Sequence, residues 1–294
     1  MVRMLNEEIQ TREVLGWKGL HLLHYHISSC SQKLRVYLNL KGLDWTSHPV
    51  DIPSGENYGT WYMGINPRGL VPTLVHDGAV IIESNDILEY LEERFPDPAM
   101  IPSGMKGEAL HRLAEENDLH LDLRALSARY LFPLEAATKP PDVLAAYEKT
   151  GSGTVGGQAD RHKGVEVAYF NDVREHGGIS DARAGAAAER FGTAYREIEA
   201  RLTESRFLLG DAISVLDIAW YVYSARLLAC GYPLHDAHPR VGAWFNGLNG
   251  RDDFSREVQI PPPLKQIAAG RQAAMTAAGR SLGDIAVNIG AAHA

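Results

Sequence analysis

The sequence predicts an α+β protein of two domains, in which a small mixed sheet precedes an all-helical region. Its 294 residues, 45% of them hydrophobic, are enough to form the cores of about two domains. Short β-rich runs alternate with helical patterns up to residue 95, whereas later apolar residues recur at helical spacing. We therefore expect an N-terminal extension over 1–18, a βαβ-ββα domain over 19–97, an all-α domain over 107–260 and a C-terminal tail over 261–294.

The first half of the sheet domain should run strand, helix, strand. Residues 20–26 have the composition of a strand, and the polar run Ser28-Ser29-Cys30-Ser31 is typical of a turn that caps a helix. The following helix, 33–41, ends at Gly42, which suits the left-handed position after a helix. Residues 45–50 then predict a second strand.

The second half should be a hairpin followed by a helix. The β-rich runs 73–76 and 79–82 are separated by an Asp-Gly pair, which favours a two-residue hairpin turn. Pro72 has no N–H for a sheet, so the strand should begin after it and leave the backbone polar groups of Val71 for a ligand. A cis Val71–Pro72 bond fits such a turn. Ser84 or Asn85 should cap the next helix, whose N-terminus would attract a carboxylate.

Residues beyond 107 carry helical patterns, with a less regular segment among them. Apolar spacing predicts helices over 108–130, 186–202 and 216–228, and a weakly amphipathic helix over 264–279 that packs back across the molecule or onto a partner subunit. Between 139 and 185, Pro and Gly clusters indicate irregular structure with short helices near 143–149 and 165–174. Such long insertions commonly carry function or disorder.

The element order is that of a thioredoxin-like domain, and three motifs resemble those of cytosolic glutathione S-transferases. The first is Asn66-Pro67-Arg68-Gly69-Leu70-Val71-Pro72, the second is Glu83-Ser84-Asn85-Asp86-Ile87, and the third, residues 207–219, resembles the family's capping box and hydrophobic staple around Ser214 and Asp217. Their order and separation span most of residues 19–260. The resemblance implies a glutathione co-substrate and a dimer, either a homodimer or a heterodimer.

The resemblance also implies which residues hold glutathione. Glu83 and Ser84 would bind its γ-glutamyl end, and the backbone of Val71, between Leu70 and Pro72, would bind the cysteinyl unit. Tyr58 lies where family members hold the glycine end, although its neighbourhood departs from the usual lysine- or glutamine-bearing pattern. We expect Leu70, Val71, Pro72, Glu83, Ser84 and Tyr58 to form the binding site.

The sulfur of glutathione needs a partner, because a free thiol with a pKa near 8.5 is mostly protonated at neutral pH. The run 28–31 offers hydroxyl donors and a helix N-terminus. Ser28 matches the catalytic serine of theta- and phi-like members, whereas Cys30 matches the reactive position of cysteine-type members; Ser29 lies between them. If Cys30 dominates, the chemistry becomes glutathione-dependent thiol–disulfide exchange.

The implied reaction is attack of the thiolate on a small hydrophobic electrophile, aromatic or halogenated. The layout of the 140–185 insertion more weakly resembles bacterial glutathione-dependent β-etherases, which cleave aryl ethers of lignin fragments. Two alternatives stay open: a Cys30-dependent oxidoreductase, and a non-catalytic transferase-like subunit of a heterodimer. The sequence names neither the second substrate nor its stereochemistry.

Composition excludes several other classes. A net charge of −8 argues against nucleic acid, and no apolar run approaches the roughly 20 residues that span a bilayer. Two cysteines form no disulfide framework, so we expect a reducing cytoplasm. On a strand, His24 and His26 share a face while His21 takes the other, and no nearby cysteine or glutamate completes a metal site. We expect no metal.

Overall fold

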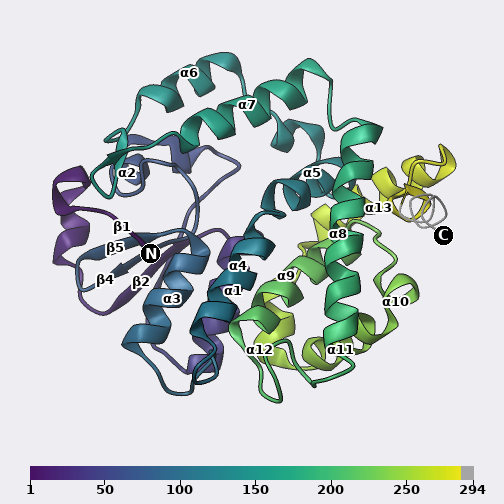
Figure 1. Ribbon diagram of the computed structural model, residues 1–294. Coiled ribbons are helices and arrows are strands. Elements are labelled where there is room, and N and C mark those ends of the chain that lie inside the picture. Colours follow the sequence, from purple (N-terminus) through teal and green to yellow (C-terminus); the bar gives the residue numbers. More distant parts are fainter. Residues whose placement is uncertain (286–294) are drawn as a thin grey trace. The chain divides into compact units, whose positions relative to one another are not determined.

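The computed structural model describes residues 1–285 and forms two compact units. The sheet unit comprises Met1–Pro98 and Thr138–Asp172; the helical unit comprises Ala99–Ala137 and the residues from Val173 onward (Figure 1). The predicted α+β class, with a thioredoxin-like first part and a helical second part, is confirmed. The expected helical range of 107–260 differs from this division, because residues 138–172 pack with the sheet instead.

The sheet contains five strands in the order β1-β5-β4-β2-β3. Their bounds are Val2–Arg3 (β1), Leu20–His24 (β2), Trp45–Pro49 (β3), Thr73–His76 (β4) and Ala79–Ile82 (β5). Strands β2 and β3 are parallel, and the other neighbours are antiparallel. The four predicted strands are present. The N-terminal extension adds the fifth, because Val2 pairs with Ile82 at the edge of β5.

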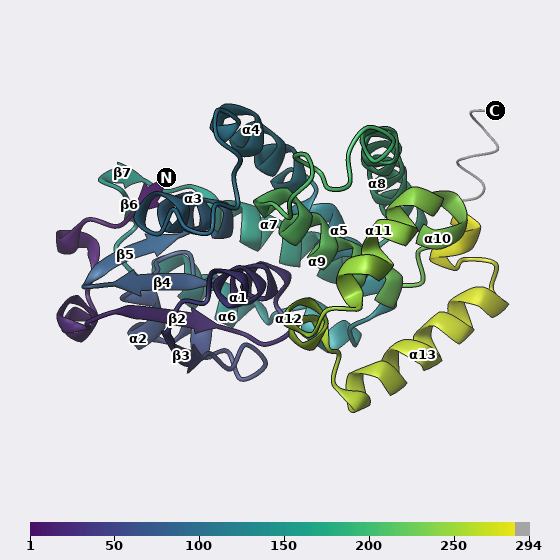
Figure 2. The same ribbon diagram turned by 90° about the horizontal axis from the view of Figure 1, so that it is seen from below.

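Helices cover both faces of this sheet. Figures 1 and 2 place α1 (Ser29–Lys41) and α3 (Ser84–Arg94) on one face and α2 (Thr60–Met63) on the other. Because successive strand residues point to opposite faces, each strand contributes to both cores. The core on the α2 face draws on strands, the N-terminal extension and the insertion, with members Met4, Ile9, Val14, Leu23, Val50, Tyr62, Ile65, Val75, Val80, Ile82 and Val155.

The hairpin turn between β4 and β5 follows the predicted chemistry. Asp77 and Gly78 have φ values of 49° and 82°, as a type I′ turn requires. A Cβ at Gly78 would lie 2.3 Å from the carbonyl oxygen of Leu15, so only glycine fits between the hairpin and the N-terminal extension.

The insertion is more regular than the sequence indicated. It contains α6 (Pro141–Lys149), a hairpin of β6 (Thr154–Val155) and β7 (Gln158–Ala159), and α7 (His162–Glu175). The two helices agree with the prediction, whereas the hairpin occupies residues for which irregular structure is expected from the sequence. Its turn is Gly156-Gly157, with φ values of 60° and 78°, so the glycines mark a type I′ turn rather than the absence of structure.

The helical unit is built from α4, α5 and the helices from α8 onward. Their bounds are Lys106–Asn117 (α4), His120–Tyr130 (α5), Asp181–Arg201 (α8), Val215–Ala229 (α9), Leu234–Ala237 (α10), Pro239–Asn249 (α11), Asp252–Ser255 (α12) and Pro262–Ala277 (α13). Short 3₁₀ turns complete the chain at Asn6–Glu8, Arg12–Gly16, Glu56–Tyr58, Leu134–Ala137 and Arg256–Val258. The helix expected over 108–130 is divided in two. Among the described helices, none is long and apolar enough to cross a bilayer.

The start of α9 carries the predicted capping box. The Asp217 carboxylate accepts hydrogen bonds from the Ser214 hydroxyl at 2.6 Å and the Ser214 N–H at 2.9 Å. It also accepts from the Leu208 N–H at 3.0 Å and the Trp244 indole at 2.9 Å. These bonds hold the chain before α9 and α11 against the start of the helix.

The tail helix α13 packs on the helical unit of its own chain. Arg271 Nη2 donates to the Arg129 carbonyl at 2.8 Å, and Gln272 Nε2 donates to the Ala229 carbonyl at 2.6 Å. These carbonyls belong to the last turns of α5 and α9, whose ends are short of intrahelical donors. The tail therefore caps two helices, in agreement with the expectation that it packs back across the molecule.

Candidate functional site

Strand register brings the three predicted site segments to one end of the sheet. Leu23 of β2 pairs with Thr73, and Thr73 pairs with Ile82 of β5. The turn after β2, the residues before β4 and the residues after β5 therefore leave the sheet at the same edge. These segments carry Ser28, Val71–Pro72 and Glu83–Ser84.

The turn after β2 caps α1. Ser28 is the N-cap residue, and its Oγ accepts a hydrogen bond from the Ser31 N–H at 3.3 Å. Its own hydroxyl hydrogen can still be donated to a ligand. Ser29 is buried at 6% exposure, so Ser29 is the least accessible of the three predicted catalytic residues. Cys30, the second helical residue, carries a reduced thiol and is partly exposed.

The other cysteine lies in a different environment. Cys230, at the C-terminal end of α9, is 1% exposed, and burial raises the pKa of its thiol to about 12. A group with that pKa is almost entirely protonated at neutral pH. Cys230 is therefore a structural residue, and Cys30 is the thiol that could react.

The turn before β4 is fixed by buried hydrogen bonds. The Val71–Pro72 bond is cis, as predicted. The Tyr62 hydroxyl and the Asn66 amide both donate to the Leu70 carbonyl, at 2.5 and 2.8 Å. Burial raises the pKa of Tyr62, so its hydroxyl stays protonated as a donor. Leu70 thus directs its carbonyl into the protein, whereas within residues 1–285 the Val71 N–H donates to no protein group and the Val71 carbonyl accepts from none.

The helix after β5 begins one residue earlier than expected. Glu83, rather than Ser84 or Asn85, occupies the N-cap position, and Ser84 is the buried first residue of α3. Glu83 has a φ of 69°, a left-handed conformation that non-glycine residues seldom adopt. Outliers of this kind concentrate at functional sites.

Glu83 is partly occupied by an ion pair. Its Oε1 lies 2.6 Å from Arg68 Nη1, and the Glu83 side chain is 32% exposed. Its second oxygen, Oε2, has no hydrogen-bond partner in the described part of the chain. That oxygen is available to a cation from solvent or from a ligand.

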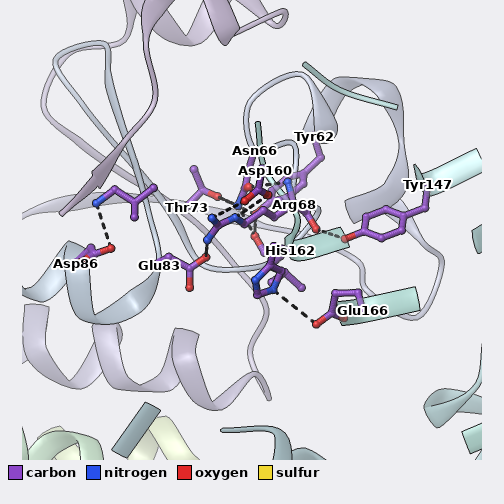
Figure 3. Close-up of polar contacts among 12 residues, drawn as sticks. Tyr62, Asn66, Arg68, Thr73, Glu83, Asp86, Tyr147, Asp160, His162 and Glu166 are labelled. Carbon is purple, nitrogen blue, oxygen red and sulfur yellow. Dashed lines mark hydrogen bonds and ion pairs between the residues drawn. The ribbon is translucent and has the colours of Figure 1, made fainter. Parts of the chain in front are cut away.

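Arg68 joins Glu83 to the insertion. Its Nε and Nη2 contact the two oxygens of Asp160 at 3.0 and 2.8 Å, a bidentate pair. The Tyr147 hydroxyl donates to the Arg68 carbonyl at 2.7 Å (Figure 3). Burial opposes the charge of Arg68, but its bonds to Asp160 and Glu83 more than offset this and raise its pKa. No sequence pattern indicates the Asp160 contact, because 92 residues separate the partners.

Tyr58 also contacts the insertion. Its ring centroid lies 4.7 Å from that of Tyr147, and Lys139 Nζ lies 5.6 Å from the Tyr58 ring centroid. The insertion therefore contacts the sheet unit beside two predicted binding elements, Tyr58 and the Arg68 turn.

Both helix N-termini at this edge suit an anion, and the Glu83 carboxylate adds a place for a cation. The N-terminus of α1, with the Ser28 hydroxyl, suits an anion such as a thiolate. At α3, the helix N-terminus with Ser84 suits a carboxylate, and the Glu83 carboxylate beside it suits an ammonium group. A molecule with a thiol and an α-amino acid end would match both.

The histidines considered as metal ligands form other contacts. His21 Nδ1 lies 2.9 Å from His48 Nε2, and His24 Nε2 lies 2.8 Å from Ser47 Oγ. Across the described residues, no cluster of three or more potential metal ligands is found.

The helical unit contains a pocket of its own, of about 450 Å³. Apolar residues on its wall include Leu119, Ile198, Leu208, Leu216 and Trp220, and arginines and acidic residues of α4 and α8 complete it. All three arginines are already paired, since Arg112 and Arg201 both contact Glu108 at 3.0 Å and Arg190 pairs with Asp122. Leu123 and Tyr130 of α5 are buried in the core.

Comparisons with known proteins agree with this architecture. Residues 27–94 match the profile of the glutathione S-transferase N-terminal domain, and residues 167–247 match that of the C-terminal domain. The first match contains the predicted site segments from Ser28 to Ser84. The second begins after the hairpin and Asp160.

Similar curated proteins match about a third of the chain. A zeta-class glutathione S-transferase of Euphorbia esula is 42% identical over 92 residues, which are 31% of this chain and 41% of that protein. A maleylacetoacetate isomerase of Pseudomonas aeruginosa is 44% identical over 87 residues, 29% of this chain and 41% of that protein. The matched region thus spans about two fifths of these relatives.

Solved structures match over most of the chain. The β-etherase LigF of Sphingobium superposes with a TM-score of 0.66 at 21% identity, covering 81% of this chain and 98% of the other. Poplar glutathione transferase F1 superposes with a TM-score of 0.60 at 16% identity, covering 82% and 97%. At these identities the likeness concerns the fold. Both domain profiles match in the expected order on a thioredoxin-like sheet followed by a helical unit, and the chain belongs to the cytosolic glutathione S-transferase family.

Proposed function

We propose that the protein is a glutathione-dependent transferase whose binding site is the sheet edge formed by Ser28, Val71 and Glu83. The convergence of two helix N-termini and the Val71–Pro72 turn at one edge supports this most strongly. The γ-glutamyl carboxylate would bind Ser84 at the start of α3, and its ammonium would bind Glu83. The backbone of Val71 would hold the cysteinyl unit.

In this proposal, Ser28 activates the thiol. Its hydroxyl donates a hydrogen bond to the glutathione sulfur and, with the N-terminus of α1, lowers the thiol pKa. The thiolate then attacks an electrophilic carbon, so that a carbon–sulfur bond forms as the leaving group departs with its electron pair. Binding both reactants together supplies much of the acceleration. We propose an aromatic electrophile, with lignin-derived β-aryl ethers as the narrower candidate suggested by the insertion and the LigF likeness.

A second candidate is a glutathione oxidoreductase, and the partial exposure of Cys30 at a helix N-terminus favours it. The Cys30 thiolate would attack a glutathione disulfide, forming a Cys30–glutathione mixed disulfide and releasing one glutathione thiolate. A third candidate, a non-catalytic transferase-like subunit of a heterodimer, would bind glutathione without turnover.

Two substitutions separate these candidates. If Ser28 activates the thiol, Ser28→Ala should raise the apparent thiol pKa of bound glutathione and lower kcat by about tenfold or more. Cys30→Ala should then retain most of the activity. Thiolate absorbance against pH, with turnover of an aromatic halide, measures both effects. The reverse ranking, or a glutathione adduct on Cys30 by mass spectrometry, would favour the oxidoreductase.

A further inference from the structure

The insertion reaches the proposed γ-glutamyl site through one guanidinium group. Arg68 binds Asp160 with two of its nitrogens and Glu83 with the third. The side chains of Arg68 and Asp160 are only 15% and 12% exposed, so water screens their pair weakly. Figure 3 shows Arg68 between the two carboxylates.

We propose that Asp160 is a positioning residue that keeps Glu83 available to the ammonium group of glutathione, an inference that rests on the proposed function. Arg68 paired with Glu83 alone would neutralise it and compete with the ligand. Because Asp160 holds two of the three guanidinium nitrogens, Arg68 contacts Glu83 through Nη1 alone and leaves Oε2 open. The second carboxylate keeps the local charge negative, which an ammonium group requires.

Asp160 is held where this role needs it. The residue follows β7 directly, and its N–H donates to the Gly153 carbonyl at 3.1 Å. Glu8 accepts hydrogen bonds from the N–H groups of Gly156 and Gly157 at 3.0 and 2.8 Å, which fixes the hairpin to the N-terminal extension. Val155 belongs to the core of the sheet unit. A carboxylate held on such a support needs no rearrangement when a ligand binds.

The proposal assigns a specificity role to the insertion. Glutathione carries an ammonium group on its γ-glutamyl unit, whereas glutaryl-cysteinylglycine is the same molecule without that group. The site should prefer glutathione, and the preference should depend on Asp160. A residue that merely held the fold together would affect the two ligands alike.

Titration calorimetry on the full chain with each ligand tests this. Asp160→Asn should weaken glutathione binding about tenfold, because Arg68 then neutralises Glu83, the charged hydrogen-bond partner of the ammonium group. The affinity for the analogue should change by less than about twofold. KM for glutathione should rise by the same factor while kcat at saturation stays unchanged. Asp142→Asn is the matched control, because it removes an exposed carboxylate of the same insertion, and it should change neither affinity.

Equal weakening of both ligands, or no weakening of either, in a wild-type protein that binds glutathione would overturn the role of Asp160 and leave the proposed function intact. A wild-type protein that binds neither ligand would overturn the proposed function and this inference with it. Thermal unfolding of each variant verifies the fold, and Asp160→Ser gives the same readout if the asparagine variant does not fold.

Discussion

Glu83 and Asp217 are both carboxylates at the start of a helix, but their surroundings differ. Asp217 is fully buried and accepts four hydrogen bonds from Leu208, Ser214 and Trp244. Glu83 is 32% exposed, has one ion-pair partner and adopts a left-handed backbone conformation. The Asp217 carboxylate, whose hydrogen-bonding capacity is already filled, can only support the fold. The Glu83 carboxylate still has an oxygen to offer and can bind a ligand. Burial and the number of bonds already made, rather than the motif, distinguish the two roles.

Removal of Asp217 should have the largest effect on stability. Asp217→Ala leaves the N–H groups of Leu208, Ser214 and Trp244 without their acceptor in a buried site, so the free energy of unfolding should fall by about 3 kcal/mol or more. Denaturant unfolding at neutral pH measures the loss. The exposed Asp211 precedes the same helix, and Asp211→Ala should cost less than about 0.5 kcal/mol. Equal losses would contradict the structural role given to Asp217.

Substitution of Glu83 should instead affect binding. Glu83→Gln removes a partly exposed ion pair, so the free energy of unfolding should fall by less than about 1 kcal/mol. The loss of the charge that receives an ammonium group should weaken glutathione binding about tenfold, as measured by calorimetry. A Glu83→Gln variant that binds glutathione normally but is much less stable would mean that Glu83, like Asp217, supports the fold.

The smallest and most local of the expected effects is the pH dependence of the β6–β7 hairpin, which Glu8 holds. Burial would raise the pKa of Glu8, but hydrogen bonds from Leu5, Gly157, Thr154 and Gly156 lower it below its ordinary value. A lowered pKa in the folded state means that the contribution is present above the unfolded value of about 4.3 and is lost as pH falls through the folded value.

We therefore expect the β6–β7 hairpin to loosen in acid by about 1 kcal/mol, the scale of one hydrogen bond. Hydrogen exchange at Gly156 and Gly157, measured from pH 7 down to pH 3, would detect this. Glu8→Gln should already exchange faster at pH 7 and lose most of the acid dependence. An unchanged profile in that variant would mean that another group controls the hairpin.

The features that were predicted from sequence depend on neighbours along the chain. The Asp77-Gly78 turn, the glycine that ends α1, the strand that begins after Pro72 and the Ser214–Asp217 box all involve residues within a few positions of each other. Backbone sterics and local hydrogen bonds decide such features, so they can be read directly from residue type and spacing.

Other parts of the candidate site depend on contacts between residues far apart in the chain. Arg68 and Asp160 are 92 positions apart, and Glu8 and Gly157 are 149 apart. Neither pair is indicated by a periodic pattern or a turn motif. Ion pairs and hydrogen bonds between residues far apart in the sequence constrain only the two groups that meet. The sequence by itself determined the order of elements and three segments of the candidate site. The tertiary structure decided that the insertion joins the sheet unit and which carboxylates are saturated, because burial and pairing exist only once distant segments have packed together.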